Sequence, residues 1–185
     1  MQSMAIALAI GGSLFLATSP PGAESMRATA ADMRVMEPYL GEFRSATQLF
    51  DDGKTEHHFL VKYEWFDRGQ SIVKFTISMV IPSQDRVLRN AEGFYGFDSI
   101  RRQLYVFGAF SHGASGWGTI CKFDLDSGAR TICAQTMNPD GTVTQVRDAF
   151  EVVDASSWKN TTRIRHQEEG DWQLAHKGIY TRIGP

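Results

Sequence analysis

The stretch HHFLVKYEWFDRGQSIVKFTISMV, residues 57–80, decides the fold. It holds two runs of alternating apolar and polar residues on either side of the triplet Asp67-Arg68-Gly69. Alternation with a period of two is typical of a half-buried β-strand. A three-residue hairpin loop ends on a residue with positive φ, which glycine adopts at no steric cost. If the triplet is such a loop, Tyr63 faces Val73 and the apolar residues of both strands share one face of the sheet.

The same kind of triplet, two polar or turn-forming residues followed by glycine, recurs at 51–53, 126–128, 139–141 and 168–170. One triplet is weak evidence, but five between strand-like runs predict a meander of hairpins. The loop at 51–53 also pairs Phe43 with Val61. Strands are expected near 41–49, 55–65, 71–81, 87–97, 103–111, 117–125, 129–137, 143–153, 158–167 and 172–183.

Short connections throughout favour antiparallel pairing of consecutive strands. Many short strands without helices between them indicate a β-sandwich or an up-and-down barrel, and the lack of a long return loop favours the barrel. The run from Thr29 to Leu40 has helical spacing of its apolar residues and predicts a short helix. The predicted fold is therefore all-β, a roughly ten-stranded antiparallel up-and-down barrel with a short N-terminal helix.

The composition excludes few functions. A chain of 185 residues with a net charge of −2 suits one domain and lacks the basic character that nucleic-acid binding usually requires. It also gives no reason to expect binding to an anionic membrane surface.

The N-terminal residues have the pattern of a targeting segment. Met4 to Ala17 are apolar or small, and small residues follow up to Ser25, which is typical of a signal peptide and too short to span a bilayer. We expect residues 1–25 to be removed, leaving 26–185 as one periplasmic or secreted domain without a membrane span. The segment has no Lys or Arg before its apolar run, and a start at Met26 would instead give a cytoplasmic protein.

Three segments resemble known barrels. MEPYLGEF (36–43) resembles the short helix and entry strand of small calycin-type barrels, with Phe43 where Trp is commoner. GFYGFDSIRRQLYVFGAF (93–110) and EEGDWQLAHKGIYTRIG (168–184) resemble strands of an uncharacterised bacterial lipocalin-like family. The resemblance implies a ten-stranded barrel distantly similar to fatty-acid-binding and nitrobindin-like barrels, and no established activity.

The resemblance to nitrobindin-like barrels also implies a late-strand histidine as an axial haem ligand, here His176. The glycine-rich entry motif of nitrobindins is absent, and a lone barrel histidine is more often a hydrogen-bonded polar residue. No cofactor is therefore expected, with haem at His176 as the alternative.

The two cysteines, Cys121 and Cys133, face each other if residues 126–128 form the loop between their strands. In an oxidising compartment they would form a disulfide. The alternative is a pair of small buried side chains. A metal site is not expected, because the cysteines lack a suitable spacing to histidine.

The last predicted hairpin gathers polar side chains on its inner face. Its loop at 168–170 places Thr162 opposite His176 and Trp158 opposite Tyr180. A Tyr-x-Arg pair pointing into a barrel would suit a ligand carboxylate. The alternative is that the arginine closes the barrel end by binding carbonyls of the N-terminal segment. The inner face also holds His166, Trp172 and Arg182.

Three functions remain open on the sequence alone. The first is a barrel that binds an apolar or amphipathic ligand, which could carry a carboxylate. The second is an enzyme using lumenal His176, His166 and Tyr180, and the third is a structural or interaction protein whose barrel is filled by its own side chains. No catalytic motif is present, and the oligomeric state stays open. A lumen below about 300 Å³ would favour the filled core, and a titratable partner within reach of His176 would favour the enzyme. The candidate ligand-binding residues are Tyr63, Trp65, His166, Trp172, His176, Tyr180 and Arg182.

Overall fold

The computed structural model describes residues 28–50, 52–166 and 170–184. The predicted signal peptide lies outside these residues. Within the described part of the chain, no helix combines the length and the apolar character needed to cross a membrane. The elements, in chain order, are η1 (Ala30–Tyr39), β1 (Gly41–Ser45), β2 (Gln48–Leu49), β3 (Glu56–Trp65), β4 (Ile72–Ile81), η2 (Pro82–Gln84), β5 (Arg86–Asp98), β6 (Gln103–Phe110), β7 (Ser115–Phe123), β8 (Arg130–Met137), β9 (Val143–Asp154), β10 (Ser157–Arg165) and β11 (Gln173–Arg182).

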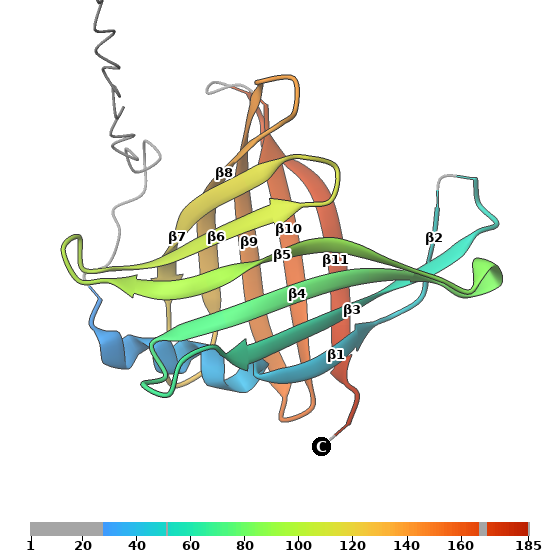
Figure 1. Ribbon diagram of the computed structural model, residues 1–185. Coiled ribbons are helices and arrows are strands. Elements are labelled where there is room, and N and C mark those ends of the chain that lie inside the picture. The colour runs from blue at the N-terminus through green and yellow to red at the C-terminus, as the bar shows by residue number, and fades with distance from the viewer. Residues whose placement is uncertain (1–27, 51, 167–169, 185) are drawn as a thin grey trace, which may run out of the picture.

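The strands form a closed antiparallel barrel, which confirms the predicted fold class. From β3 to β11 each strand pairs with the next along the chain, and β1 pairs with both β11 and β3 to close the ring (Figure 1). The two-residue strand β2 is an addition to the ten strands of the ring and pairs with β3. The expected strand at 41–49 is thus divided into β1 and β2.

Several predicted pairings are confirmed, among them Thr162 with His176 and Trp158 with Tyr180 across β10 and β11. Residues 139–141 form a three-residue loop, closed by a hydrogen bond of 2.9 Å from the Asn138 N–H to the Thr142 carbonyl. Phe43 of β1 faces Val61 of β3, as predicted, although β2, next to the loop, pairs Gln48 with His57, one residue away from the predicted register. These pairs fix which residues of the flanking strands face inward.

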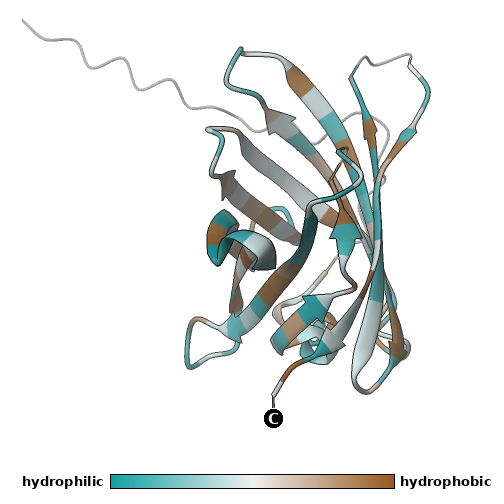
Figure 2. Ribbon diagram, turned by 90° about the vertical axis from the view of Figure 1, so that its right-hand side faces the viewer, coloured by the Kyte–Doolittle hydropathy of each residue, from teal (hydrophilic) through white to brown (hydrophobic). Residues whose placement is uncertain are grey.

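The hairpin between β3 and β4 differs from the prediction in its loop length. Its loop spans 67–71, because the Asp67 carboxylate accepts hydrogen bonds from two backbone N–H groups at the far end of the loop. Tyr63 consequently faces Phe75 rather than Val73. A register shift of two residues leaves every side chain on its predicted face, since side chains alternate with a period of two. The strands accordingly show alternating hydrophobic and hydrophilic bands (Figure 2).

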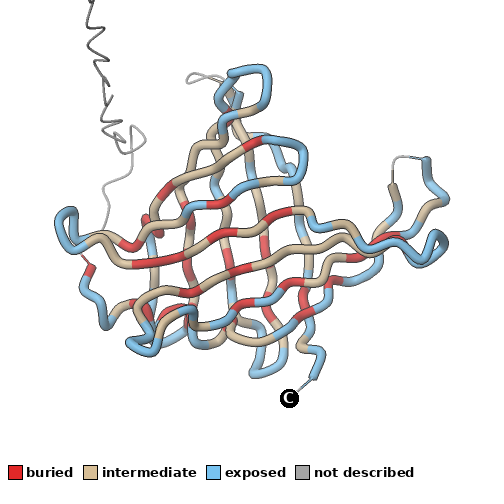
Figure 3. The backbone as a smooth tube through the Cα atoms, viewed as in Figure 1, coloured by how far each residue is buried: buried red, intermediate tan, exposed pale blue. Residues whose placement is uncertain are grey.

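The 3₁₀ helix η1 lies across one end of the barrel and closes it (Figure 1). Four of its side chains belong to the buried core, namely Met33, Val35, Met36 and Tyr39. The Tyr39 hydroxyl donates a hydrogen bond of 2.8 Å to the Gly128 carbonyl in the loop between β7 and β8. Buried residues alternate with less buried ones along the strands, whereas the loop tips are exposed (Figure 3).

A disulfide joins β7 to β8, with the Cys121 and Cys133 sulfur atoms 2.07 Å apart and their Cα atoms 5.7 Å apart. The two cysteines were expected to be direct cross-strand partners, and they are not. The loop between the strands spans 125–128 rather than 126–128, since the Asp124 N–H bonds to the Ala129 carbonyl. A β-bulge at Cys121 shifts the register by one more residue, so that Thr119 is the residue opposite Cys133. The bulge adds one residue to β7 and turns Cys121 toward its diagonal neighbour.

Candidate functional site in the barrel lumen

The barrel encloses a cavity of about 500 Å³. This exceeds the volume of about 300 Å³ below which a filled core would be favoured and falls in the range of small-molecule sites. Most of the wall is apolar, with aromatic rings from strands all around the ring. Examples are Phe59, Tyr63, Phe75, Tyr95, Phe110 and Trp158.

Glycines in β5 and β6 help to make the space. Gly93 and Gly108 are cross-strand partners, and the Phe75 ring lies against both. A Cβ atom would come within 2.6 Å of the Phe75 Cζ atom at Gly93 and within 3.0 Å of it at Gly108. The ring therefore rests against the backbone of this wall, where any other residue would push it away.

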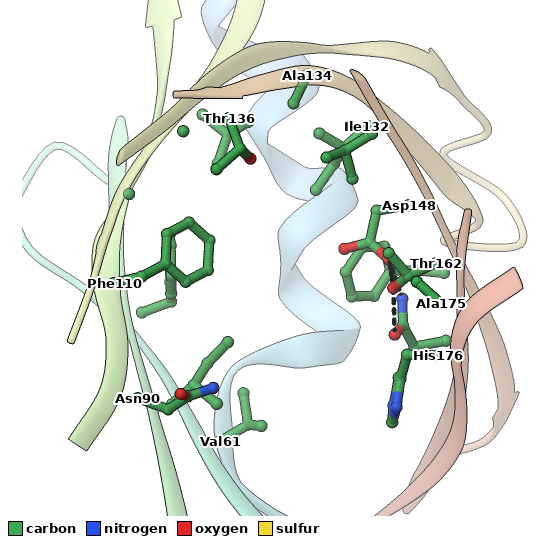
Figure 4. Close-up of a pocket in the computed structure, with 18 of the residues that line it drawn as sticks. Val61, Asn90, Phe110, Ile132, Ala134, Thr136, Asp148, Thr162, Ala175 and His176 are labelled. Carbon is green, nitrogen blue, oxygen red and sulfur yellow. Dashed lines mark hydrogen bonds between the residues drawn. The ribbon is translucent and has the colours of Figure 1, made fainter. Parts of the chain in front are cut away.

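A polar cluster on β9 and β10 interrupts the apolar wall. Asp148 points into the cavity (Figure 4). Its Oδ1 atom accepts a hydrogen bond of 2.7 Å from the Thr162 hydroxyl and another from the Asn160 side-chain amide. Burial raises the pKa of Asp148, while these two hydrogen bonds and the positive charge of Arg130 counteract the rise. The cluster thus holds a carboxylate in a mainly apolar surrounding. Hydrogen bonds offset part of the free-energy cost of this placement, and such perturbed groups cluster at functional sites.

His176 and Tyr180 of β11 form a second polar pair beside the cluster. The His176 Nε2 atom lies 3.1 Å from the Tyr180 hydroxyl, and the Tyr180 ring stacks on Trp158 with 4.1 Å between centroids. Burial lowers the pKa of His176, which keeps the imidazole neutral at neutral pH, and burial raises the pKa of Tyr180. The distance meets the geometric condition for an acid–base pair. The raised pKa keeps the phenol protonated, so the pair presents neutral hydrogen-bonding groups to the cavity.

The predicted site residues are only partly brought together. Tyr63, His176 and Tyr180 line the cavity. Trp65 does not line it, and instead borders a small hollow beside Arg34 and Glu37 of η1. The inward face predicted for β3 therefore continues past the lumen to the helix that closes the barrel.

Trp172 lies on the outside of the barrel, contrary to the predicted inward orientation. Its ring contacts the guanidinium groups of Arg147 and Arg165, whose Cζ atoms are 4.4 Å and 4.9 Å from its centroid. A register shift in the last hairpin is the cause, because beyond Thr162 the pairing moves by one residue. Leu174, two residues further along the same face of the hairpin, is 61% exposed for the same reason.

His166 and Arg182 also lie away from the cavity wall. His166 is exposed at the end of β10, with its Nδ1 atom 3.2 Å from the Thr144 hydroxyl. Arg182 donates a hydrogen bond of 2.6 Å to the Leu40 carbonyl, and its Cζ atom lies 4.6 Å from the centroid of the Phe43 ring. Arg182 thus takes the alternative role, closing the barrel end, and is engaged with the backbone rather than free to bind a ligand carboxylate.

Arg130 is a second buried charge that the sequence did not reveal as part of the interior. It is 2% exposed, and its Cζ atom lies 3.6 Å from the Tyr39 ring centroid and 4.1 Å from that of Phe150. None of its three guanidinium nitrogens has a hydrogen-bond partner among the described residues. It does not line the cavity, because aromatic rings separate it from the lumen. Cation–π contact with these rings is its stabilising interaction.

Haem fits this interior poorly. An axial histidine offers one ring nitrogen to iron, and the His176 Nε2 atom is engaged with the Tyr180 hydroxyl. The charged group on the described cavity wall is the Asp148 carboxylate, whereas haem propionates call for cations. We derive no function through haem.

The comparisons agree with the fold. No family model and no curated protein matches this sequence. Among solved structures, Rv2717c from M. tuberculosis is 12% identical, with a TM-score of 0.59 over 86% of this chain and 100% of that chain. The S-type phycobiliprotein lyase CPES from Guillardia theta is 10% identical, with a TM-score of 0.49 over 86% of this chain and 95% of that chain. At 12% identity the likeness to Rv2717c concerns the fold alone.

Proposed function

We propose that this protein binds a small, largely apolar molecule in the barrel lumen. The observation that carries the proposal is the cavity of about 500 Å³ with a mainly apolar and aromatic wall. A barrel built only for stability would fill this space, because protein interiors are normally packed without voids of such size.

The polar groups of the wall support binding of an oriented molecule. They lie on neighbouring strands, β9, β10 and β11, while the wall around them is mainly apolar. A few convergent polar groups in an apolar pocket typically fix the orientation of a ligand. The Asp148 cluster and the His176–Tyr180 pair supply these groups.

Titration with the neutral fluorescent probe N-phenyl-1-naphthylamine tests the proposal. We expect saturable binding at one site per chain and a loss of binding on Ala134→Trp, because Ala134 lines the cavity and the indole would fill it. Native mass spectrometry of the protein purified from its own host provides a second readout through a co-purifying molecule.

The matched control is Ala149→Trp. Ala149 belongs to β9, next to the inward-facing Asp148 and Phe150, and therefore faces outward. This variant should bind the probe like the wild-type protein. Absence of saturable binding in a folded wild-type protein would refute the proposal.

We also propose that the protein is exported. The Cys121–Cys133 disulfide supports this, because disulfides persist in oxidising compartments. Expression of the full chain in a bacterial host, followed by fractionation and intact-mass measurement, should find a periplasmic or secreted product shortened by about 25 residues. A full-length cytoplasmic product would contradict export.

A further inference from the structure

We infer that the lumen selects ligands that carry a protonated amine, and that Asp148 binds this group. The inference rests on the proposed function and names the ligand class. It differs from the sequence-based expectation of a ligand carboxylate, which relied on Arg182. That arginine binds backbone carbonyls at the end of the barrel instead.

The cavity wall carries a negatively charged group and no positively charged one among the described residues. Among the described residues that line the cavity, Asp148 is the only Asp, Glu, Lys or Arg. His176 is held neutral because burial lowers its pKa. A ligand carboxylate would therefore meet a like charge without a cation on the wall to bind it.

The buried cation Arg130 does not change this conclusion. Its guanidinium is sealed between the rings of Tyr39 and Phe150, and its nitrogen atoms are inaccessible. A ligand in the cavity meets the rings and not the N–H groups. Arg130 acts on Asp148 only through space, by partly counteracting the effect of burial on the carboxyl pKa.

The carboxylate is held in a suitable position. The two hydrogen bonds that it accepts, from Thr162 and from Asn160, both go to the Oδ1 atom. No hydrogen bond within the described residues uses the Oδ2 atom, and the carboxylate points into the cavity (Figure 4). One oxygen is therefore fixed by the protein, and the other is available to a charged donor, which forms the stronger kind of hydrogen bond.

The aromatic wall suits the same cation. The faces of aromatic rings carry negative charge density and attract ammonium groups, more strongly where water is excluded. The rings are distributed around the cavity, and one of them, Phe150, lies two residues from Asp148 on the same inward face of β9. The wall includes Phe59, Phe75, Phe110, Phe150, Trp158 and Tyr180.

Three matched probes test the inference, each a dansyl group on a five-carbon chain that ends in an amine, an alcohol or a carboxylate. At neutral pH we expect the wild-type protein to bind the amine at least about tenfold more tightly than the alcohol, which is the worth of one buried charged hydrogen bond. The carboxylate should bind most weakly. Asp148→Asn keeps the size and the Oδ1 acceptor, and should reduce amine affinity to that of the alcohol.

The control variant is Glu151→Gln, which removes a carboxylate from the outer face of the same strand, where it pairs with Lys159. It should leave all three affinities unchanged. Equal affinities for the three probes, or tightest binding of the carboxylate, would overturn the inference and leave lumenal binding intact. Failure of all three probes and of the neutral naphthylamine would overturn both proposals. The wild-type series decides the matter even if Asp148→Asn does not fold.

Discussion

The interior of this barrel holds two charges in different surroundings. Arg130, near the closed end, contacts aromatic rings and has no hydrogen-bond partner within the described chain. Asp148, on the wall, receives two hydrogen bonds and keeps one oxygen toward open space. A buried charge packed against rings serves the architecture, whereas a buried charge facing a cavity is available for recognition. Burial alone does not distinguish the two.

The largest effect should come from Arg130. Arg130→Ala removes a buried side chain from between Tyr39 and Phe150 and should lower the free energy of unfolding by about 3 kcal/mol, measured by urea denaturation. Arg130→Met fills the space without a charge and should lose no more than about 1 kcal/mol, since apolar replacements of buried charges are often neutral. Naphthylamine binding should persist in the methionine variant. Equal losses in both variants would show that the charge itself is required.

A smaller effect with the opposite sign is expected at Asp148. Because burial raises the pKa of Asp148 in the folded state, its ionisation disfavours folding as pH rises from the ordinary aspartate value through the raised one. Asp148→Asn should therefore be more stable than the wild-type protein at neutral pH, by about 1 kcal/mol, and this gain should vanish in acid. Denaturation of both proteins across this pH range is the measurement. A variant that is less stable at neutral pH would show that the carboxylate is a structural element.

The smallest effect should be at Trp172, whose cation–π contacts lie on the outside. Trp172→Leu should cost about 0.5 kcal/mol, the lower end for exposed contacts, and leave naphthylamine affinity unchanged. The matched variant inside, Trp158→Leu, removes a ring that lines the cavity and stacks on Tyr180, and should change the affinity. A loss of binding on Trp172→Leu would place that ring in the site after all.

The period-two pattern predicted the barrel correctly even though the length of the β3–β4 loop was wrong, because an error of two residues leaves each side chain on the same face of the sheet. The β3–β4 loop is two residues longer than predicted, yet Tyr63 keeps its face because two residues are one full period. A β-bulge shifts the register by one and reverses the face. No residue type in the sequence indicated the register shift beyond Thr162, so Trp172 was predicted on the wrong face of the sheet.

The central residue of the proposed site was missed for a related reason. The predicted strands between residues 117 and 153 carry apolar residues on both faces. Composition therefore did not indicate whether Asp148 faces the inside or the outside of the barrel. Its register does follow from the loop at 139–141, which has the predicted form. Arg130 gave no such signal, because a charged residue beside a turn normally faces water. Its place inside depends on rings contributed by η1 and β9, far apart in the sequence.

Arg182 ties the last strand of the barrel to the residue before the first strand, since its guanidinium binds the carbonyl of Leu40, a partner 142 positions earlier in the chain. The ring is completed only by β11, so a nascent chain that lacks this strand has unpaired edges at β1 and β10. Exposed edges of this kind recruit other strands, and contacts of such long sequence separation form slowly. The chain should thus be most prone to self-association during its synthesis. This tendency should be lowest once β11 has paired with β1 and β10.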